Sequence, residues 1–229
     1  YKTDVSYKAL NEYFTFQNIF SDLTLFKGIK LLPPANHLEF KLKEGLHYQN
    51  KFWDFEFKEE HTFSTETDYV NELDRMFGQA VNRQLVSDME IGSYLSGGMD
   101  SGGITSIAAK SSPHWKTFTA GFDLSSASGM EMAFDEREKA EFLSHEYHTE
   151  HYEVVLKAGD MERVMERLIW HQEDLRVGQC YPNYYINRLA SKFVPVALAG
   201  VGGDELFAGY PWRYYRTVVN KNFDDYIDE

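Results

Sequence analysis

The sequence predicts an α/β fold in which helices cover both faces of a parallel sheet. Strand-like runs alternate with helical ones in the second half of the chain, the strands at 91–96, 117–122, 151–156 and 194–200 and the helices at about 103–111, 135–147, 160–171 and 182–192. This alternation is typical of βαβ units, which are built on parallel strands. Two glycine-rich segments follow the first and last strands, where ligands bind in such sheets.

A change of composition at residues 50–65 divides the chain. Before it, a helical run at 7–16 precedes the segment LFKGIKLLPPANHLEFKL, in which two prolines separate short apolar runs typical of strands or turns. After it, Thr65 can cap a helix with one apolar face. We therefore expect two domains, residues 1–60 and 61–229.

Composition limits the classes of partner. The formal net charge is −13, whereas phosphate binding by a nucleic-acid partner needs clustered Lys and Arg. Cys180 is the only cysteine, which rules out a disulfide within the chain and offers no zinc motif. We expect no signal peptide, because the first residues are polar and mixed, and no run comes near the ~18 apolar residues of a membrane span. We expect a cytoplasmic protein with neither a membrane nor a nucleic-acid partner.

The first glycine-rich segment, SYLSGGMDSGG at 93–103, has the chemistry of a phosphate cradle. Gly97 and Gly98 allow a tight turn and a close approach of backbone to ligand. Ser96 and Ser101 offer hydroxyl groups, and the amides of the following helix point toward the turn. Asp100 would repel phosphate directly and is therefore expected to bind Mg²⁺ that bridges to phosphate oxygens.

The second segment, AGVGGDELFAGY at 199–210, follows the strand that ends near Leu198. Because parallel strands place their carboxyl ends on one edge of the sheet, the two segments can face one ligand.

These motifs resemble those of glutamine-hydrolysing asparagine synthetases. SGGMDS resembles the PP-loop of ATP pyrophosphatases, and GGDELFAGY resembles the GDGGDELFGGY segment of that family. The segments TFTAGF and FDEREKAEFLSHEYHTEHYEVVL also resemble family segments, and LFKGIKLLPPANHLEF is similar to the end of the family's glutaminase domain. The resemblance runs from near residue 7 to near residue 215.

The resemblance implies a five-stranded-type parallel sheet of the adenine nucleotide alpha hydrolase-like class (PP-loop, HUP/Rossmann-like). It identifies residues 1–60 as the C-terminal remnant of an Ntn glutaminase domain with its linker. Residues 61–229 would then be the N-terminal half of the synthetase domain. We expect the chain to be a fragment of a longer enzyme.

The resemblance also implies a reaction. Aspartate attacks ATP to give β-aspartyl adenylate and pyrophosphate, and ammonia derived from glutamine then displaces AMP to leave asparagine. The implied cofactors are ATP and Mg²⁺, and the implied partners are aspartate and ammonia or glutamine supplied through a glutaminase domain. The sequence leaves open whether the protein forms a homodimer.

The site residues implied by the resemblance lie in three segments. Ser96, Gly97, Gly98, Asp100 and Ser101 match the pyrophosphate loop, Leu95 and Ala120 match backbone positions that meet adenine, Gly200 matches a nucleotide contact, and Asp100 and Asp204 match the catalytic Mg²⁺ ligands. Two carboxylates on neighbouring loops at one sheet edge can hold a metal that neutralises the departing pyrophosphate.

Several positions depart from the family pattern. Val201 replaces an acidic residue linked to the substrate site, and Asn36, Ala199 and Gly102 replace glycine, serine and serine. Residue 1 is Tyr rather than the cysteine nucleophile of the glutaminase, so we expect no glutamine hydrolysis by this chain. The resemblance implies that a catalytic lysine comes from a later part of the family's domain, so we expect the isolated fragment to be inactive.

Other functions stay open. Val201 is consistent with a relative that forms another amide, such as a β-lactam or a macrocycle. A nucleotide-binding module without turnover is a further alternative. A tRNA-modifying PP-loop enzyme is disfavoured by the acidic charge and the lack of a basic patch. Glu173 and Asp174 could bind substrate or form a solvated helix end. Asp135 lies at the start of a helix, where the helix dipole favours its negative charge.

Overall fold

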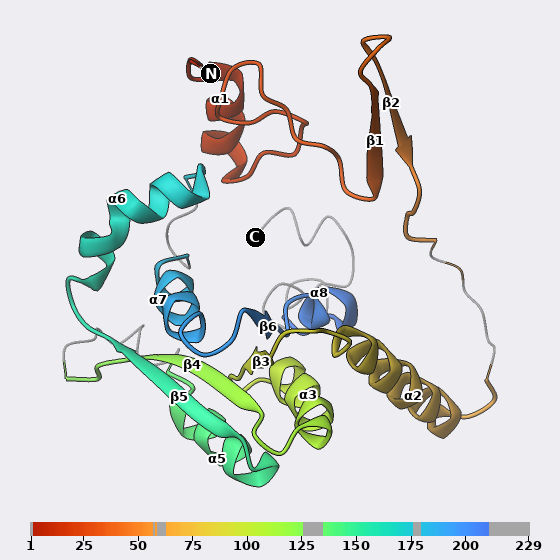
Figure 1. The fold of residues 1–229 in the computed structure, drawn as a ribbon, viewed down its shortest axis with the longest axis vertical. Coiled ribbons are helices and arrows are strands. Elements are labelled where there is room, and N and C mark those ends of the chain that lie inside the picture. Colours follow the sequence, from red (N-terminus) through yellow and green to blue (C-terminus); the bar gives the residue numbers. More distant parts are fainter. Residues whose placement is uncertain (1, 57, 59–62, 126–134, 176–179, 211–229) are drawn as a thin grey trace, which may run out of the picture. The chain divides into compact units, whose positions relative to one another are not determined.

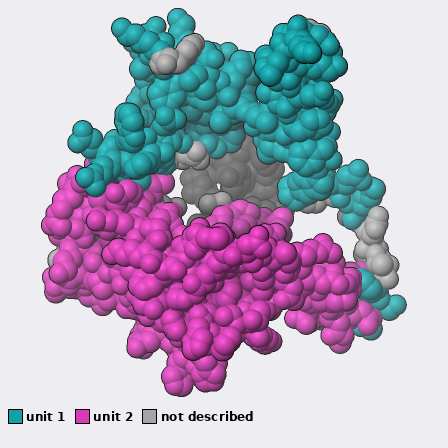
Figure 2. Space-filling view, viewed as in Figure 1, with its two compact units in different colours: residues 1–66, 166–178 teal, residues 67–165, 179–229 magenta. Residues whose placement is uncertain are grey.

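The computed structural model describes residues 2–56, 58, 63–125, 135–175 and 180–210 (Figure 1). The chain divides into two compact units, the first formed by residues 1–66 and 166–178 and the second by residues 67–165 and 179–229 (Figure 2). The segment 166–178, expected in the second domain, thus groups with the first unit. The assignment of residues 1–60 to a glutaminase remnant stays a prediction.

The first unit contains helix α1 (Tyr7–Phe16), which matches the helical run expected at 7–16. The helix begins after Ser6, whose Oγ accepts a hydrogen bond of 3.4 Å from the amide of Ala9. The apolar run that follows the two prolines forms a strand of the antiparallel hairpin β1 (Asn36–Lys41) and β2 (Leu46–Lys51).

The second unit alternates strands and helices as the sequence predicts. Its elements are α2 (Glu66–Gln84), β3 (Ile91–Tyr94), α3 (Met99–Ala108), the 3-10 turn η1 (Ala109–Ser111), β4 (Lys116–Phe122), α5 (Arg137–Tyr147), β5 (Glu150–Leu156), α6 (Asp160–Gln172), α7 (Cys180–Ala190), β6 (Val196–Leu198) and α8 (Gly203–Phe207), with α6 continuing into the first unit. Within the described ranges, no helix is both long enough and apolar enough to cross a bilayer.

The four strands of the second unit form one parallel sheet in the order β5-β4-β3-β6. This confirms the predicted fold class, and four strands of the sheet lie within the described residues. The chain proceeds from β3 outward to β4 and β5 and then returns to place β6 on the other side of β3. The strand order therefore reverses between β3 and β6, and the carboxyl ends of these two strands flank the reversal point.

Helices pack on both faces of the sheet, with α7 on one face of β4 and β5 and α5 on the other (Figure 1). On the α7 face, Phe118 is fully buried and packs with Ala190 and Val194. A second apolar cluster joins Val81 of α2 to Trp115, the residue before β4. These clusters fix the strands from which the glycine-rich turns emerge.

A buried cluster of polar side chains joins strand β3 to helix α3, on the face of the sheet opposite to α7. Ser93 Oγ accepts a hydrogen bond of 2.9 Å from Trp115 Nε1 and lies 2.9 Å from Thr105 Oγ1 of α3. Ser93 and Thr105 are fully buried, and Trp115 is buried as well. Buried polar atoms are costly without partners, so this group holds α3 in one position against β3.

Candidate functional site

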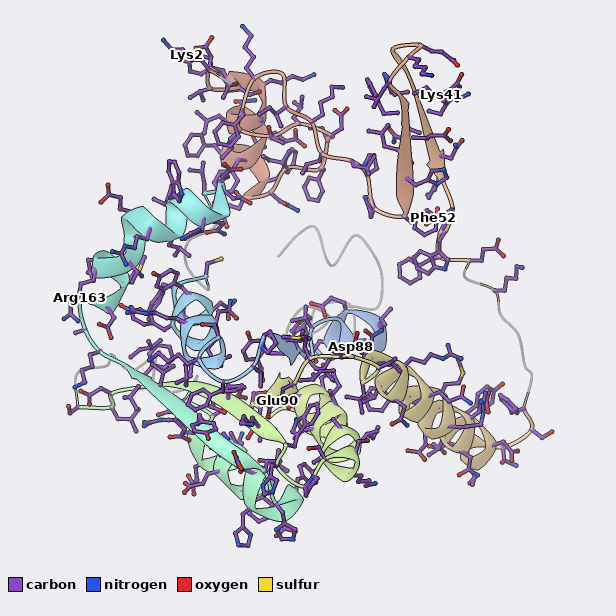
Figure 3. All side chains as sticks on the ribbon, in the orientation of Figure 1. Lys2, Lys41, Phe52, Asp88, Glu90 and Arg163 are labelled. Carbon is purple, nitrogen blue, oxygen red and sulfur yellow. The ribbon has the colours of Figure 1, made fainter. Side chains whose placement is uncertain are left out.

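The two glycine-rich turns lie at the carboxyl ends of neighbouring strands. β3 and β6 pair in parallel with Ile91 opposite Val196 and Ser93 opposite Leu198, so both strands end at the same edge. Figure 3 labels Glu90, whose carboxylate pairs with Lys116 at the opposite, amino end of the sheet. The carboxyl edge at the reversal of strand order is where open α/β sheets bind ligands.

Leu95 anchors the start of the first turn. Its amide donates a hydrogen bond of 2.9 Å to the carbonyl of Phe118, and its own carbonyl accepts one from Thr119 Oγ1. Its side chain is buried. Both partners belong to β4, and Ala120, the other position expected to meet adenine, is the next residue of that strand. The backbones of Leu95 and Ala120 therefore share one edge.

Two serines brace the first turn from inside. Ser101 Oγ accepts a hydrogen bond of 3.0 Å from the amide of Ser96 and lies 2.8 Å from Ser96 Oγ. Ser96 Oγ in turn accepts a hydrogen bond of 3.1 Å from the amide of Gly98. Ser101 is only 8% exposed. The hydroxyl groups of Ser96 and Ser101, which the sequence predicted to bind phosphate, therefore also stabilise the conformation of the turn.

Helix α3 begins directly inside this turn. Gly98 is its N-cap, and no side chain caps the helix with a hydrogen bond. The amides in the first turn of a helix have no partner within the helix, and the helix dipole adds a partial positive charge there. The start of α3 therefore offers backbone donors to an anion.

The second turn passes directly over the start of α3. A Cβ atom added at Gly200 would lie 2.7 Å from the amide nitrogen of Ser101 and 3.0 Å from the carbonyl carbon of Asp100. A Cβ atom added at Gly203 would overlap the Asp100 carboxylate. Gly202 between them has a φ of +112°, which only glycine adopts without strain. The structure therefore brings the two turns into contact, and the absence of side chains at Gly200 and Gly203 permits this approach.

Asp100 and Asp204 occupy this meeting point. Asp100 lies in the first turn of α3 with its carboxylate against Gly203, and Asp204 is the next residue along the chain, in the first turn of α8. In the described part of the chain, no group of three or more His, Cys, Asp or Glu side chains could hold a metal. The Asp204 carboxylate lies against Gly209, so the two carboxylates contact different glycines of the second segment. Mg²⁺ is commonly bound by one or two carboxylates together with substrate phosphates, which is the chemistry that the sequence predicts for Asp100 and Asp204.

Two cations at this edge were not indicated by the motifs. Arg137 Nη2 donates to the carbonyl of Phe122 at 2.8 Å, and its side chain lies against Gly121 of β4. Lys139 lies across Gly97 of the first turn. Both cations stand in the first turn of α5, where the helix dipole disfavours positive charge, and this anomaly is the sequence signal that could have revealed them.

Asp135 lies at the start of a helix, as expected, and has a further role. Its carboxylate accepts a hydrogen bond of 3.2 Å from the amide of Arg137, the first residue of α5, and further hydrogen bonds from Arg137 Nε at 2.9 Å and Nη2 at 2.6 Å. These hydrogen bonds lower the pKa of Asp135 and raise the pKa of Arg137. The pair therefore stays ionised at neutral pH and fixes Arg137 against the end of β4.

The remaining sequence candidates lie elsewhere. Val201 is 92% exposed, although its neighbours Gly200 and Gly203 face the first turn. Glu173 and Asp174 belong to the first unit, where they line a cavity of about 690 Å³ with several residues from the segments 3–13 and 18–31. The aromatic segment 211–216, for which packing is the favoured role and lining of the pocket the alternative, lies outside the described residues.

Comparison with known proteins identifies relatives of the chain. The asparagine synthase family matches residues 72–228. Glutamine-hydrolyzing asparagine synthetase 1 of Bacillus subtilis (strain 168) is 31% identical over 218 residues, which cover 95% of this chain and 33% of the relative. Glutamine-hydrolyzing asparagine synthetase 3 of the same organism is 32% identical over 206 residues, which cover 85% and 32%. The chain spans about one third of the length of these curated relatives.

Among solved structures, NMN synthetase from Francisella tularensis aligns with a TM-score of 0.38 and 16% identity over 65% of this chain and 59% of that one. This score is too low to support an inference about the chain. The match to the asparagine synthase family covers well over half of the chain and includes both glycine-rich turns. The chain therefore belongs to the asparagine synthase family.

Proposed function

We propose that the chain forms the nucleotide-binding part of an ATP-dependent amide ligase of the asparagine synthetase type. In the proposed reaction, the side-chain carboxylate of aspartate attacks the α-phosphorus of ATP, which gives β-aspartyl adenylate and releases pyrophosphate. Ammonia then attacks the acyl carbon, and AMP leaves as asparagine forms. The observation that carries the proposal is the contact of Gly200 and Gly203 with Asp100 and Ser101 at the start of α3.

In this proposal the first turn and the start of α3 bind the β and γ phosphates. The uncapped amides and the helix dipole attract the negative charge. The hydrogen bonds between Ser96 and Ser101 hold the turn in shape before the ligand arrives, so the donors need little reorganisation as charge builds on the leaving pyrophosphate. The backbones of Leu95 and Ala120 would meet the adenine.

Asp100 and Asp204 would hold Mg²⁺ together with the phosphate oxygens. Bound there, the ion supplies charge neutralisation for the pyrophosphate that departs. The two carboxylates come from different turns, so the contact between the turns is needed to present them to one ion. This dependence makes the packing of Gly203 against Asp100 part of the proposed chemistry.

The proposals for the source of ammonia and for the acyl substrate are supported by other observations. The relatives are named as glutamine-hydrolyzing enzymes, which supports glutamine as the source of ammonia in the parent protein. Val201 favours a second candidate, a relative that forms another amide. This side chain is 92% exposed beside the nucleotide turn, and an isopropyl group cannot replace the contacts of a carboxylate.

The test of nucleotide binding is a pair of glycine substitutions. Gly200→Ala would place a methyl group 2.7 Å from the amide nitrogen of Ser101, and we expect the dissociation constant for ATP with Mg²⁺ to rise about tenfold or more because a hydrogen bond to a charged group is lost. Gly78→Ala in α2 is the control, since its added Cβ would meet nothing within 4 Å. Isothermal titration calorimetry measures both variants.

Equal ATP affinity in the two variants would contradict the proposed position of the phosphates. The chemistry is tested separately in the full-length protein, where aspartate-dependent exchange between ATP and pyrophosphate supports asparagine synthesis. Exchange that depends on another carboxylic acid would favour the second candidate. ATP binding with no exchange would assign a binding role without turnover.

A further inference from the structure

We propose that Lys139 is a polyphosphate-binding residue, which supplies the first turn with a cation from helix α5. The inference rests on the proposed nucleotide site and adds to it a contact outside both glycine-rich motifs. Its chemical target is the β and γ phosphates of a nucleoside triphosphate, or free pyrophosphate. The juxtaposition that carries it is the Lys139 side chain lying across Gly97.

The position of the Lys139 stem is defined by Gly97. A Cβ atom added at Gly97 would lie 2.6 Å from Lys139 Cβ, 3.1 Å from Cγ and 2.5 Å from Cδ. Three successive carbons of the stem therefore follow the turn, and only glycine at 97 leaves room for them. The ammonium is two covalent bonds beyond Cδ, so a flexible stem held at the turn can bring it to an anion bound there.

The charge of Lys139 has no structural use that the described residues reveal. Its neighbour Arg137 pairs with Asp135, but none of the ion pairs found in the described ranges includes Lys139. Lys139 is also exposed and lies in the first turn of α5, where the helix dipole opposes a cation. The helix dipole therefore disfavours a cation at this position, and an anion bound beside Lys139 would offset that cost.

The charge balance of the chain makes a local cation useful. With 36 acidic and 23 basic residues, the molecule repels a polyphosphate at long range. The backbone amides of α3 bring only partial charges, whereas Lys139 brings a full one to the same turn. Because the residue is exposed, we expect its contribution to be modest and sensitive to salt.

The test compares two lysine substitutions in the chain with ATP, pyrophosphate and adenosine as probes. Lys139→Met keeps the apolar stem over Gly97 and removes the charge. Lys110→Met removes an exposed charge from η1, beyond the carboxyl end of α3, and is the matched control. We expect Lys139→Met to weaken ATP and pyrophosphate binding about fivefold at low salt and to leave adenosine binding unchanged.

Further measurements separate the effect of the Lys139 charge from an effect on the structure of the turn. Lys139→Arg should restore most of the affinity, and the difference between wild type and Lys139→Met should shrink as ionic strength rises. Equal pyrophosphate affinity in the Lys139→Met and Lys110→Met variants would overturn the inference while the proposed nucleotide site stands. If the wild-type chain binds neither ATP nor pyrophosphate, both proposals fail.

Discussion

Ser101→Ala tests whether the first turn is held by its own hydroxyl groups. Ser101 Oγ accepts a hydrogen bond from the amide of Ser96 at 3.0 Å and contacts Ser96 Oγ at 2.8 Å. Its longer contacts, to the carbonyls of Ser96 and Gly98, are 3.4 Å and 3.3 Å. Alanine removes all four contacts and leaves the Ser96 amide without its acceptor.

The expected cost follows from the burial of these groups. Loss of one partner of a buried hydrogen bond costs about 1–3 kcal/mol. Ser101 is 8% exposed but Ser96 is only half-buried, so water can partly replace the lost acceptor. We therefore expect the free energy of unfolding to fall by about 1–2 kcal/mol, measured by urea denaturation followed by near-ultraviolet circular dichroism.

The matched control is Ser106→Ala in the same helix. Ser106 Oγ donates to the carbonyl of Gly103 at 2.8 Å, a local bond to a helix carbonyl whose loss strands no buried amide. Both changes replace serine by alanine within α3, so any gain in helix propensity is similar. We expect Ser106→Ala to stay within about 0.5 kcal/mol of wild type. A Ser101→Ala variant as stable as Ser106→Ala would refute the proposed bracing.

Two further substitutions probe the frame around the site. Ser93→Ala strands the indole N–H of Trp115 in the core and should lower the free energy of unfolding by about 2 kcal/mol in a urea titration; no loss would mean that the hydrogen bond is dispensable. For Asp135→Asn, the sign follows from the lowered pKa of Asp135 beside Arg137: its stabilising contribution is present above the ordinary carboxyl pKa and is lost as the pH falls through the lowered value. Wild type should therefore melt above Asp135→Asn near pH 7, and the gap should be smaller at a pH below the ordinary carboxyl pKa. A gap of equal size at both pH values would contradict the ion-pair assignment.

The sequence predicted the order of elements well but misplaced the start of α3. The helical pattern begins at about 103, whereas α3 starts at Met99. Glycine is a poor helix former, so Gly102 and Gly103 favour a longer loop on propensity alone. In the structure, Cβ atoms at these positions would lie 3.3 Å from Leu143 and 3.2 Å from Phe77. Close packing by other helices therefore overrides local propensity here.

The meeting of the two turns was predictable, whereas for the cations beside them the sequence offered only the anomaly of positive charge at the start of a helix. A parallel sheet sends the ends of β3 and β6 to one edge, and this follows from the alternation of strands and helices. Arg137 and Lys139 reach that edge from α5, and neither belongs to a motif with fixed spacing to the glycines. Sequence patterns define local geometry, but a long side chain that crosses from another element depends on packing.

Gly203 and the Asp100 carboxylate act as one structural unit. Any side chain at 203 would overlap that carboxylate, so the second turn can approach the first only when residue 203 is glycine. Asp204 follows directly in the first turn of α8, and its carboxylate lies against Gly209. If one ion binds both carboxylates, the geometry of that metal site depends on Gly203, which has no side chain and cannot bind the ion. A substitution at Gly203 would then disturb metal binding through Asp100, although neither carboxylate is altered.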